Sequence, residues 1–224
     1  MGKKNKKIKV AVWSCARISS KRCPSKMVRN FCGTTLTDIF LKKMQYLKNK
    51  NVDVFFAGYE KTFKKKCLKY KIPFVQRSKK SATVDEPAFE IYKFLLEQKF
   101  DYFLQVNACM PFLKAETIHQ FLKKCIKLKK PCFAVYRVNN YFLDLKNKPI
   151  NFSNNIETIN TKKVKNIKEF AHAFYFFKKN YFEENKWYWN WKKLNYIEID
   201  KSQEIFDIDT EYDFKLAESL YKNN

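Results

Sequence analysis

The stretch Val10–Lys26, VAVWSCARISSKRCPSK, begins as an apolar run and turns at once into small polar residues. Four cations lie in its polar part: Arg17, Lys21, Arg22 and Lys26. An apolar strand that ends in such a loop is typical of the carboxyl edge of a parallel sheet, where ligands bind. The chain has only three glycines and contains neither a P-loop nor a GxGxxG fingerprint.

The cationic loop has two interpretations. Arg17 can contact phosphate oxygens in a bidentate manner, Lys21 supplies a mobile point charge, and the hydroxyls of Ser19 and Ser20 are donors. These side chains would replace a glycine-rich backbone around a triphosphate. In a lysine-rich chain the same residues also fit a solvated basic turn, and their spacing leaves both interpretations open.

Outward from this loop, apolar β-rich runs alternate with amphipathic stretches. The pattern predicts strands at 8–15, 52–58, 73–77, 101–107, 132–138, 171–179 and 195–200. It predicts helices at 36–50, 61–71, 86–99, 114–130 and 210–222, and an aromatic helix or surface segment at 181–193. This alternation predicts an α/β fold in which helices cover both faces of a mostly parallel central sheet.

A single domain is expected to span residues 1–224. Between 139 and 170 the regular pattern gives way to Asn, Lys and scattered apolar residues. Loops of this length without regular structure are uncommon unless they are functional. We therefore interpret 139–170 as an insertion, a dimerisation arm or a substrate lid.

Composition narrows the class of protein. Lys and Arg number 46 against 22 Asp and Glu, so the formal net charge is +24. Such an excess fits a polyanionic partner, such as nucleic acid, a membrane surface or a nucleotide. The lysines are spread along the whole chain, however, and occur with many Asn, Phe, Tyr and Ile. We prefer A/T-rich codon bias as the explanation of this mixture.

The seven cysteines include no CxxC pair and no histidine at ligand spacing, which argues against a zinc site. Their odd number and scatter predict reduced thiols and a cytoplasmic protein. The apolar run Val10–Cys15 is too short for a secretory segment or a membrane span. We therefore expect no association with a membrane.

Paired carboxylates occur near the carboxyl terminus, in the segment FDIDTEYDFKLAE. Asp207 and Asp209 alternate along an extended run, so both side chains project from one face. Hard oxygen ligands of this kind suit Mg²⁺, which keeps waters and substrate phosphates as further ligands. Asp213 lies near the start of the closing helix, where an acidic side chain favours the helix dipole.

Two segments at opposite ends of the chain resemble the signatures of one family. ARISSKRCPSK resembles the A-R-x-x-S-x-R-x-P-x-K pattern of the cytidylyltransferases that activate sugar acids, such as acylneuraminate and 3-deoxy-manno-octulosonate cytidylyltransferases. The matching positions are Arg17, Ser20, Arg22, Pro24 and Lys26. The carboxyl-terminal segment resembles D-I-D-T-x-x-D-x-x-x-A-E, matched at Asp207, Asp209, Thr210, Asp213, Ala217 and Glu218.

Weaker similarities lie between these two segments. FLQVNACMPFL is similar to a family segment that follows a central strand, through Gln105 and Pro111. QRSKKSATVDE resembles another family segment through Arg77 and Asp85. The similarities follow the family's order along nearly the whole chain.

The resemblance implies a Rossmann-like nucleotidyltransferase fold and an enzyme that transfers CMP from CTP to an acceptor, with release of pyrophosphate. It also implies a homodimer, a role in surface glycan biosynthesis, and Mg²⁺ held by Asp207 and Asp209. Catalytic roles fall on Arg17, Lys21 and Asp209. Nucleotide contacts fall on Ala16, Arg17, Ser20, Lys21, Arg22, Lys26, Arg77 and Gln105. Acceptor contacts fall on Gln105, His172 and Tyr175.

The chain departs from the family pattern at three places. Met27 stands where the family generally has Asn or Pro, and Ala57–Glu60 replaces an S-T-D segment. Ala171 and His172 replace an Asn-Gly pair that helps to shape the acceptor pocket. We expect retained triphosphate chemistry and an altered acceptor, either a sugar acid or a phosphorylated or phosphonate compound. A family member that binds nucleotide without turnover stays open.

Neither histidine resembles a general base. His119 lies within the predicted helix 114–130, where a surface or packing role is expected. For His172, contact with an unusual acceptor and packing among neighbouring aromatic residues of its strand both stay open.

A basic nucleic-acid-binding protein is the main alternative. Trp187, Trp189 and Trp191 alternate with other residues, so on a strand they would form a stacking platform, whereas on a helix they would mostly pack. This alternative does not explain why a cationic loop at a strand end is combined with a distant pair of carboxylates. We therefore expect a small anionic acceptor and a nucleotide, rather than nucleic acid, as partners.

Overall fold

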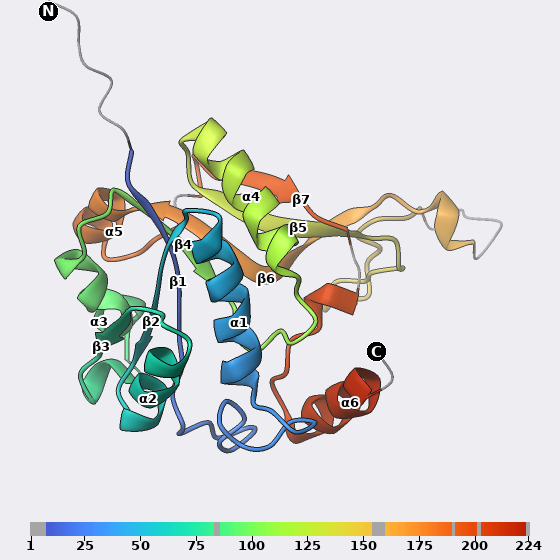
Figure 1. Cartoon of the computed structure of the whole chain (residues 1–224). Helices are drawn as coiled ribbons and strands as arrows, with labels where there is room; N and C mark the ends of the chain where they lie inside the picture. Colours follow the sequence, from blue (N-terminus) through green and yellow to red (C-terminus); the bar gives the residue numbers. More distant parts are fainter. Residues whose placement is uncertain (1–7, 83–85, 154–159, 190, 201–202, 223–224) are drawn as a thin grey trace, which may run out of the picture.

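The computed structural model describes residues 8–82, 86–153, 160–189, 191–200 and 203–222, so Asp85 lies outside the described residues. Within them, seven strands form one sheet in the order β3-β2-β1-β4-β6-β5-β7 (Figure 1). Each strand overlaps one of the predicted apolar runs, and β6 begins before its run. The strands are β1 Val10–Cys15, β2 Asp53–Gly58, β3 Phe74–Gln76, β4 Tyr102–Val106, β5 Cys132–Val138, β6 Ile167–Lys178 and β7 Asn195–Glu198.

The sheet is mostly parallel, as predicted. Among the described strands, β6 runs antiparallel to both of its neighbours, β4 and β5, while the other pairings are parallel. In the central pairings, Trp13 of β1 lies opposite Phe55 of β2 and Gln105 of β4. Because β1 to β4 share one direction, their carboxyl ends meet at one edge of the sheet, where the cationic loop begins.

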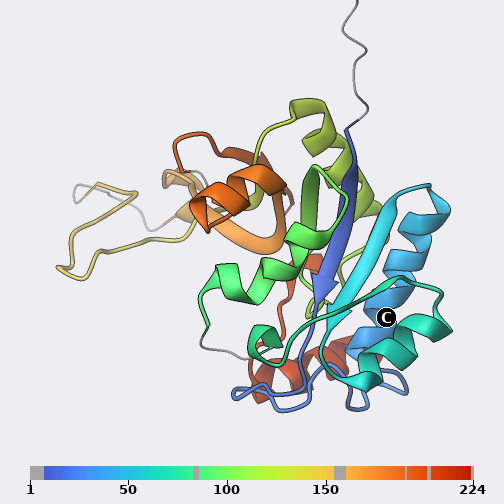
Figure 2. The same ribbon diagram turned by 90° about the vertical axis from the view of Figure 1, so that its left-hand side faces the viewer.

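Helices cover both faces of the sheet, which confirms the predicted layers (Figure 2). Alternation along β1 directs Val12 into one core and Ala11 and Trp13 into the other. The first core includes residues of α1 Leu36–Asn49, α2 Lys61–Lys69, α4 Ala115–Leu128 and α6 Glu211–Lys222. The second core includes residues of α3 Ala88–Tyr92, the 3₁₀ helix η2 Lys93–Glu97 and α5 Lys179–Asn185.

The helix predicted at 86–99 and the helix or surface segment predicted at 181–193 differ in extent from the elements of the structure. The run 86–99 forms α3 and then η2 because Tyr92 leaves the helical conformation, with φ −112° and ψ 7°. Its ring packs edge-on against Trp13, with 5.3 Å between the ring centroids. Within 181–193, helix α5 ends at Asn185 because Lys186 adopts a left-handed φ of 56°.

The irregular arm is shorter than the predicted 139–170, because β6 already begins at Ile167. Its described part projects away from the sheet (Figures 1 and 2). At its base, Asn151 Nδ2 donates to the carbonyls of Asn140 and Lys165, at 2.8 and 2.9 Å. Exposed apolar side chains on the arm are Leu143, Leu145 and Ile150.

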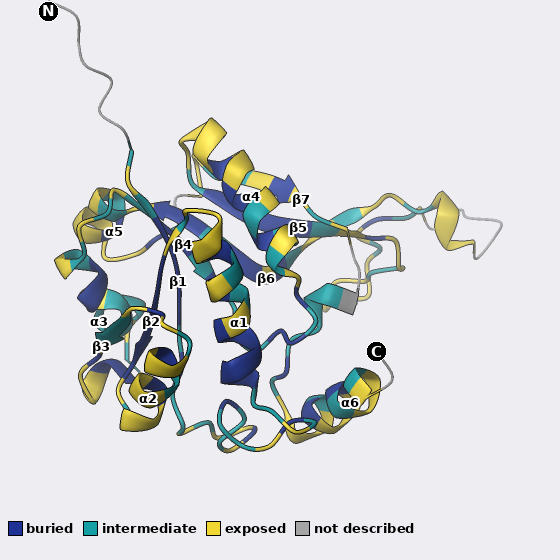
Figure 3. Cartoon of the chain, in the orientation of Figure 1, coloured by how far each residue is buried: buried dark blue, intermediate teal, exposed yellow. Residues whose placement is uncertain are grey.

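Burial follows this architecture: the central strands are buried, and the outer sides of the helices are exposed (Figure 3). No helix in the described ranges is long and apolar enough to cross a membrane. All seven cysteines lie in these ranges and have free thiols.

Candidate active site

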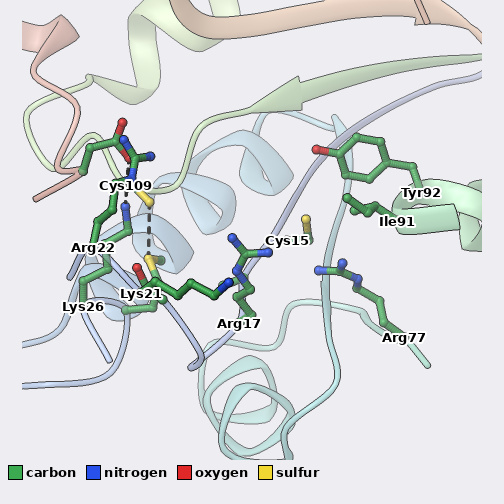
Figure 4. A pocket seen from close by; sticks show the side chains of 13 residues that line it. Cys15, Arg17, Lys21, Arg22, Lys26, Arg77, Ile91, Tyr92 and Cys109 are labelled. Atoms are coloured by element: carbon green, nitrogen blue, oxygen red, sulfur yellow. Dashed lines mark hydrogen bonds and ion pairs between the residues drawn. The ribbon is translucent and has the colours of Figure 1, made fainter. Parts of the chain in front are cut away.

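A cavity of about 560 Å³ lies at the carboxyl ends of β1, β3 and β4 (Figure 4). The loop after β1 supplies most of its wall, and α3 and the segment before α6 complete it. The cationic loop therefore borders a cavity at the edge of the sheet where a ligand is expected. The lining residues are Cys15, Ala16, Arg17, Ser20, Lys21, Arg22, Lys26, Met27, Arg77, Ile91, Tyr92, Cys109 and Asp209.

Backbone contacts fold the cationic loop against the strand ends. Ala16 N donates to the Ala57 carbonyl of β2 at 3.2 Å, and Ile18 N donates to Glu60 Oε1 at 2.9 Å. Ser25 adopts a left-handed φ of 55°, and its N–H donates back to the Ile18 carbonyl at 3.2 Å. These contacts favour a built binding loop over a solvated basic turn.

The cations of the loop divide into two groups. The side chains of Arg17 and Lys21 extend into the middle of the cavity (Figure 4). Arg22 and Lys26 instead contact Asp209: Arg22 Nη2 lies 3.0 Å and Lys26 Nζ 3.4 Å from its Oδ1. Two cations of the loop are thus directed at the cavity, and two neutralise a carboxylate at its edge.

Asp207 and Asp209 both interact electrostatically with Lys26, and of the two aspartates Asp209 lines the cavity while Asp207 does not. Asn107 Nδ2 donates to Asp207 Oδ2 at 2.9 Å, and Lys26 Nζ donates to the carbonyl of Ile208 between the aspartates. Burial, and then the charge of Asp209, raises the pKa of Asp207. Burial alone would lower the pKa of Lys26, but a thiol and the two carboxylates outweigh burial, so that pKa is raised.

One carboxylate oxygen at the site lacks a partner. Asp207 Oδ1 is buried and accepts no hydrogen bond within the described part of the chain. A buried anionic oxygen is costly unless a cation or donor satisfies it. In the same part of the chain, no three His, Cys, Asp or Glu side chains gather as metal ligands. The two carboxylates therefore fit a cation that takes most of its ligands from phosphates and water, as Mg²⁺ does.

Asp213 holds the start of α6, which confirms the structural interpretation of this residue. Thr210 N donates to Asp213 Oδ2 at 2.7 Å, and Asp213 N donates to Thr210 Oγ1 at 3.2 Å, so the two residues form a reciprocal cap. Asp209 N also donates to Asp213 Oδ2, at 3.1 Å. The cap therefore positions Asp209 as well as the helix.

The far end of the cavity combines a buried cation with an aromatic wall. Arg77 is buried, its Nε donates to Ser81 Oγ at 3.0 Å, and its guanidinium carbon lies 5.8 Å from the Phe94 ring centroid. Arg77 and Tyr92 face the same space (Figure 4). Gln105 does not line the cavity, but its Nε2 donates to the Tyr92 hydroxyl at 3.1 Å.

His172 and Tyr175 lie on β6, outside the lining of the cavity. His172 Nδ1 and the Tyr175 hydroxyl oxygen are 2.5 Å apart, and both residues interact electrostatically with Asp207. Burial, together with Tyr188 and Asp207, raises the pKa of Tyr175. The side chain of His172 is exposed, and its ring lies 6.1 Å from the Phe170 ring and 6.3 Å from the Tyr175 ring, so packing against aromatic neighbours and contact with an acceptor both stay open.

Sequence reasoning missed residues that hold the charged groups in place. Glu60 lies two residues after the predicted strand 52–58, and Asn107 is the last residue of the predicted strand 101–107, so their place at the carboxyl edge of the sheet was the available signal. Tyr92 lies inside a helical pattern, and no sequence signal marked it. His119 is partly exposed on α4, as predicted.

The tryptophans do not form a platform on a strand, because the described residues between α5 and β7 belong to no helix or strand. Trp189 stacks on Phe170 at an interplanar angle of 6° and packs edge-on against Phe133 of the sheet. Trp187 and Trp191 are 38% and 57% exposed. Trp189, the middle one of the three tryptophans, therefore packs against the sheet.

Comparison with known proteins places this site in a family. A sequence profile described as cytidylyltransferase matches residues 15–224. No curated protein sequence matches the chain. Among solved structures, the chain is similar to a CMP:2-keto-3-deoxy-manno-octonic acid synthetase complexed with CTP. The TM-score is 0.68 at 10% identity, over 96% of this chain and 99% of the other.

Two further structures have the same fold. A 4-diphosphocytidyl-2C-methyl-D-erythritol synthase from Anaerococcus prevotii gives a TM-score of 0.65 at 15% identity, over 96% of each chain. A cytidylyltransferase from Leptospira borgpetersenii gives 0.64 at 13% identity, over 97% of this chain and 88% of the other. At these identities the likeness confirms the Rossmann-like nucleotidyltransferase fold, whereas the profile covers the cationic loop and the paired carboxylates. The chain belongs to the cytidylyltransferase family of nucleotidyltransferase enzymes.

Proposed function

We propose that the protein transfers CMP from CTP to an oxygen of a small anionic acceptor and releases pyrophosphate. One observation carries this proposal: Asp209, from the segment before α6, meets the cations of the loop after β1 at a single cavity. Transfer of a nucleotidyl group needs positive charge around a triphosphate and carboxylates nearby for a metal ion. The cytosine base rests on membership of the family and on a CTP complex of a structural neighbour.

The lining of the cavity suggests how the nucleotide is held. Arg17 and Lys21 would contact the triphosphate, with Ala16, Ser20, Arg22 and Lys26 completing the phosphate side of the site. Arg77 would bind at the far end of the cavity, beside Tyr92, and Gln105 would support that tyrosine. In this arrangement the nucleotide spans the cavity between Asp209 and Arg77.

Asp207 and Asp209 are proposed to hold Mg²⁺, because the unpartnered Oδ1 of Asp207 and the pairing of the carboxylates fit a divalent cation. Mg²⁺ supplies charge neutralisation on phosphate oxygens and lowers the pKa of a bound hydroxyl. Lys26 already neutralises both carboxylates in part, and it would keep them in place while the nucleotide enters. Arg22, which is exposed, would be free to exchange Asp209 for a phosphate oxygen.

In the reaction, an acceptor oxygen forms a bond to the α-phosphorus of CTP, and the bond from this phosphorus to the pyrophosphate oxygen breaks. The proton of the acceptor hydroxyl leaves to water. Cations of the loop stabilise the charge that develops on the leaving pyrophosphate, so catalysis depends mainly on positioning and electrostatics.

The acceptor is proposed to be a sugar acid used for a surface glycan, with a phosphorylated or phosphonate compound as the variant. A neighbour described as a 2-keto-3-deoxy-manno-octonic acid synthetase supports the first class. His172 and Tyr175, beside Asp207, are the proposed acceptor contacts on β6. Free thiols at all seven cysteines fit a reducing compartment, which supports a cytoplasmic enzyme.

A homodimer is proposed to form through the arm. Leu145 is fully exposed, and Leu143 and Ile150 are more than half exposed on the same projection. Apolar side chains on a projecting segment gain by burial against a second copy. Sedimentation of the protein and of the Leu145→Lys variant tests this, because the variant should shift towards the monomer.

The activity is tested by pyrophosphate release from each nucleoside triphosphate, with Mg²⁺, against sugar acids, sugar phosphates and phosphonates. Asp209→Ala is the site variant. Asp53→Ala is its matched control, because Asp53 is exposed at the opposite end of β2. CTP-dependent release that is lost in the first variant and kept in the second supports the proposal. CTP binding without release from any acceptor would instead support a non-catalytic family member, and salt-sensitive binding of nucleic acid alone would support the main alternative.

A further inference from the structure

Strand β6 contains an irregularity beside the proposed site. Tyr175 pairs with Phe133 of β5, and the next recorded pair joins Phe170 to Val135. Five steps along β6 therefore match two steps along β5, and the surplus residues lie within 171–174. They form a bulge, a feature that often re-aims a side chain next to an active site.

The bulge lies against the end of β4. Asn107 N, directly after β4, donates to the Ala173 carbonyl at 3.0 Å. The side chain of the same asparagine donates to Asp207 at 2.9 Å. A single residue therefore connects the bulge to the carboxylate that we propose as a metal ligand, so the shape of β6 and the position of Asp207 are linked.

His172 occupies the strained position of the bulge. Its φ is 50°, in the left-handed region that residues with a Cβ atom disfavour. Ala171 and Ala173 on either side are buried, whereas His172 is exposed. The bulge thus turns the imidazole outwards while its small neighbours pack inside. Strain of this kind persists where the surrounding structure enforces it and is concentrated at functional sites.

Contacts of the imidazole leave one nitrogen available. Nδ1 contacts the Tyr175 hydroxyl, which can donate its proton to that nitrogen. With Nδ1 as acceptor, the ring proton lies on Nε2, which has no hydrogen-bond partner in the described part of the chain. The arrangement presents an oriented N–H donor beside Asp207, with which His172 interacts electrostatically.

We propose that His172 determines acceptor specificity: its Nε2–H binds an anionic group, a carboxylate or a phosphonate, near the attacking oxygen of the acceptor. This inference rests on the proposed function, because it needs an acceptor on the β6 side of Asp207. The cations Arg17, Lys21 and Arg77 line the cavity proposed for the nucleotide, whereas His172 and Tyr175 lie outside that lining. His172 therefore supplies the donor for the acceptor through Nε2–H, while Tyr175 holds the imidazole through Nδ1 and the bulge aims the ring.

Binding is tested by NMR, because the chain has only two histidines. The His172 ring signals are assigned with His172→Asn, since asparagine tolerates a left-handed φ. His119 on α4 is the internal control. Protein with Mg²⁺ and CDP, which does not undergo the transfer, is titrated with 3-deoxy-manno-octulosonate, N-acetylneuraminate or 2-aminoethylphosphonate. One class of probe should shift the His172 signals and leave those of His119 in place, which also separates a carboxylate from a phosphonate acceptor.

Steady-state kinetics test the role of His172 directly. The KM for the acceptor is measured with the compound that supports pyrophosphate release. His172→Gly fits the left-handed φ and removes the imidazole, so KM for the acceptor should rise about 10- to 100-fold with little change in KM for CTP. His172→Asn should lie between this variant and the wild type. Tyr175→Phe should also raise KM for the acceptor, because it frees Nδ1 to carry the proton. His119→Asn is the matched control and should behave as the wild type.

The outcomes separate this inference from the proposed function. Pyrophosphate release with an unchanged acceptor KM in His172→Gly would overturn the role of His172 and leave the activity standing. A His172 signal that no probe shifts would overturn the role as well. Conversely, a probe that shifts His172 in a protein without any pyrophosphate release would support the anion site and contradict the transfer reaction.

Discussion

Arg29 and Glu211 form a bidentate ion pair that ties the end of the cationic loop to the start of α6, with both N–O distances at 2.9 Å. The Arg29 guanidinium carbon also lies 3.6 Å from the Phe214 ring centroid. The hydrogen bond to Glu211 raises the pKa of Arg29, and the same contact lowers the pKa of Glu211. Lys26 precedes this arginine by three residues and Asp209 precedes this glutamate by two, so the pair holds the contact between them in register.

Breaking this ion pair should weaken catalysis without unfolding the protein. Arg29→Met is expected to lower kcat/KM for CTP about tenfold, because the loop and the carboxylates lose their common anchor. Exchange of the two charges, Arg29→Glu with Glu211→Arg, should recover part of the loss. The matched control is Arg137→Met, which breaks the Arg137–Glu198 pair of β5 and β7 at 2.7 Å. Equal effects of both methionine variants in the pyrophosphate assay would contradict the prediction.

Neutralising Asp207 should stabilise the metal-free protein and abolish activity. Burial raises the pKa of this carboxyl, so above that pKa its ionised form is less favourable in the folded than in the unfolded chain. Asp207→Asn should therefore raise Tm at pH 7.5 by about 2–4 °C. Mg²⁺ should raise Tm of the wild type and leave the variant unchanged. Thermal unfolding with and without Mg²⁺ measures both effects, and equal stabilisation by the metal would argue against Asp207 as a ligand.

Lys43 should give the protein a distinctive pH dependence. Its Nζ donates to the carbonyls of Met110 and Pro111, at 2.8 and 2.9 Å, in the loop that follows β4. Burial lowers the pKa of Lys43 from 10.5 to about 7, against the opposing charge of Glu204. Between these values the unfolded chain binds one proton more than the folded chain. Lys43 should therefore contribute a rise in the free energy of unfolding with pH, of up to about 1.4 kcal/mol per pH unit, whereas the raised pKa values of the buried thiols Cys67 and Cys109 contribute a fall near pH 9.

The variant Lys43→Met should remove this rise, because no group with a shifted pKa is left at the position. Lys42→Met is the matched control, since Lys42 is the exposed neighbour on α1. Denaturant unfolding at pH 7, 8 and 9 measures the slope for each protein. Equal slopes in the wild type and in Lys43→Met would show that other groups cause the pH dependence.

Removing the cap of α6 should reduce both stability and activity. Asp213→Ala loses the acceptor of the Thr210 and Asp209 N–H groups, and loss of such a cap costs about 1 kcal/mol. Tm should fall by about 2–4 °C. Because Asp209 loses an anchor, kcat should fall as well, whereas Asp53→Ala should change neither quantity. A normal kcat in Asp213→Ala would show that the cap serves the helix only.

Much of the fold could be predicted because its signals are local. The strand around Val12 and the strands that pair with it are short apolar runs between amphipathic stretches. This alternation can be read from a few neighbouring residues at a time. The prediction that Asp207 and Asp209 project from one face rests on the period of an extended chain. The reversed direction of β6 could not be predicted in the same way, since apolar content does not report strand direction.

Contacts in the site between residues that are far apart in the sequence could not be predicted from such local patterns. Arg22 and Lys26 look equivalent to Arg17 and Lys21 in the sequence, yet the first two contact Asp209 and the latter two extend into the cavity. Their directions depend on the turn at the end of the loop and on the docking of α6. The turn is local, but the docking of α6 joins residues more than 180 positions apart.

By itself, the sequence determined the layers of the fold, the edge of the sheet that carries the loop, and the chemistry available there, because periodicity and residue type are properties of short segments. Only the tertiary structure decided how those groups are used. It joined Arg29 to Glu211, left one oxygen of Asp207 unsatisfied, and turned His172 outwards in a bulge. These features arise from packing between segments distant in sequence, where burial and neighbouring charge, rather than local preference, set position and pKa.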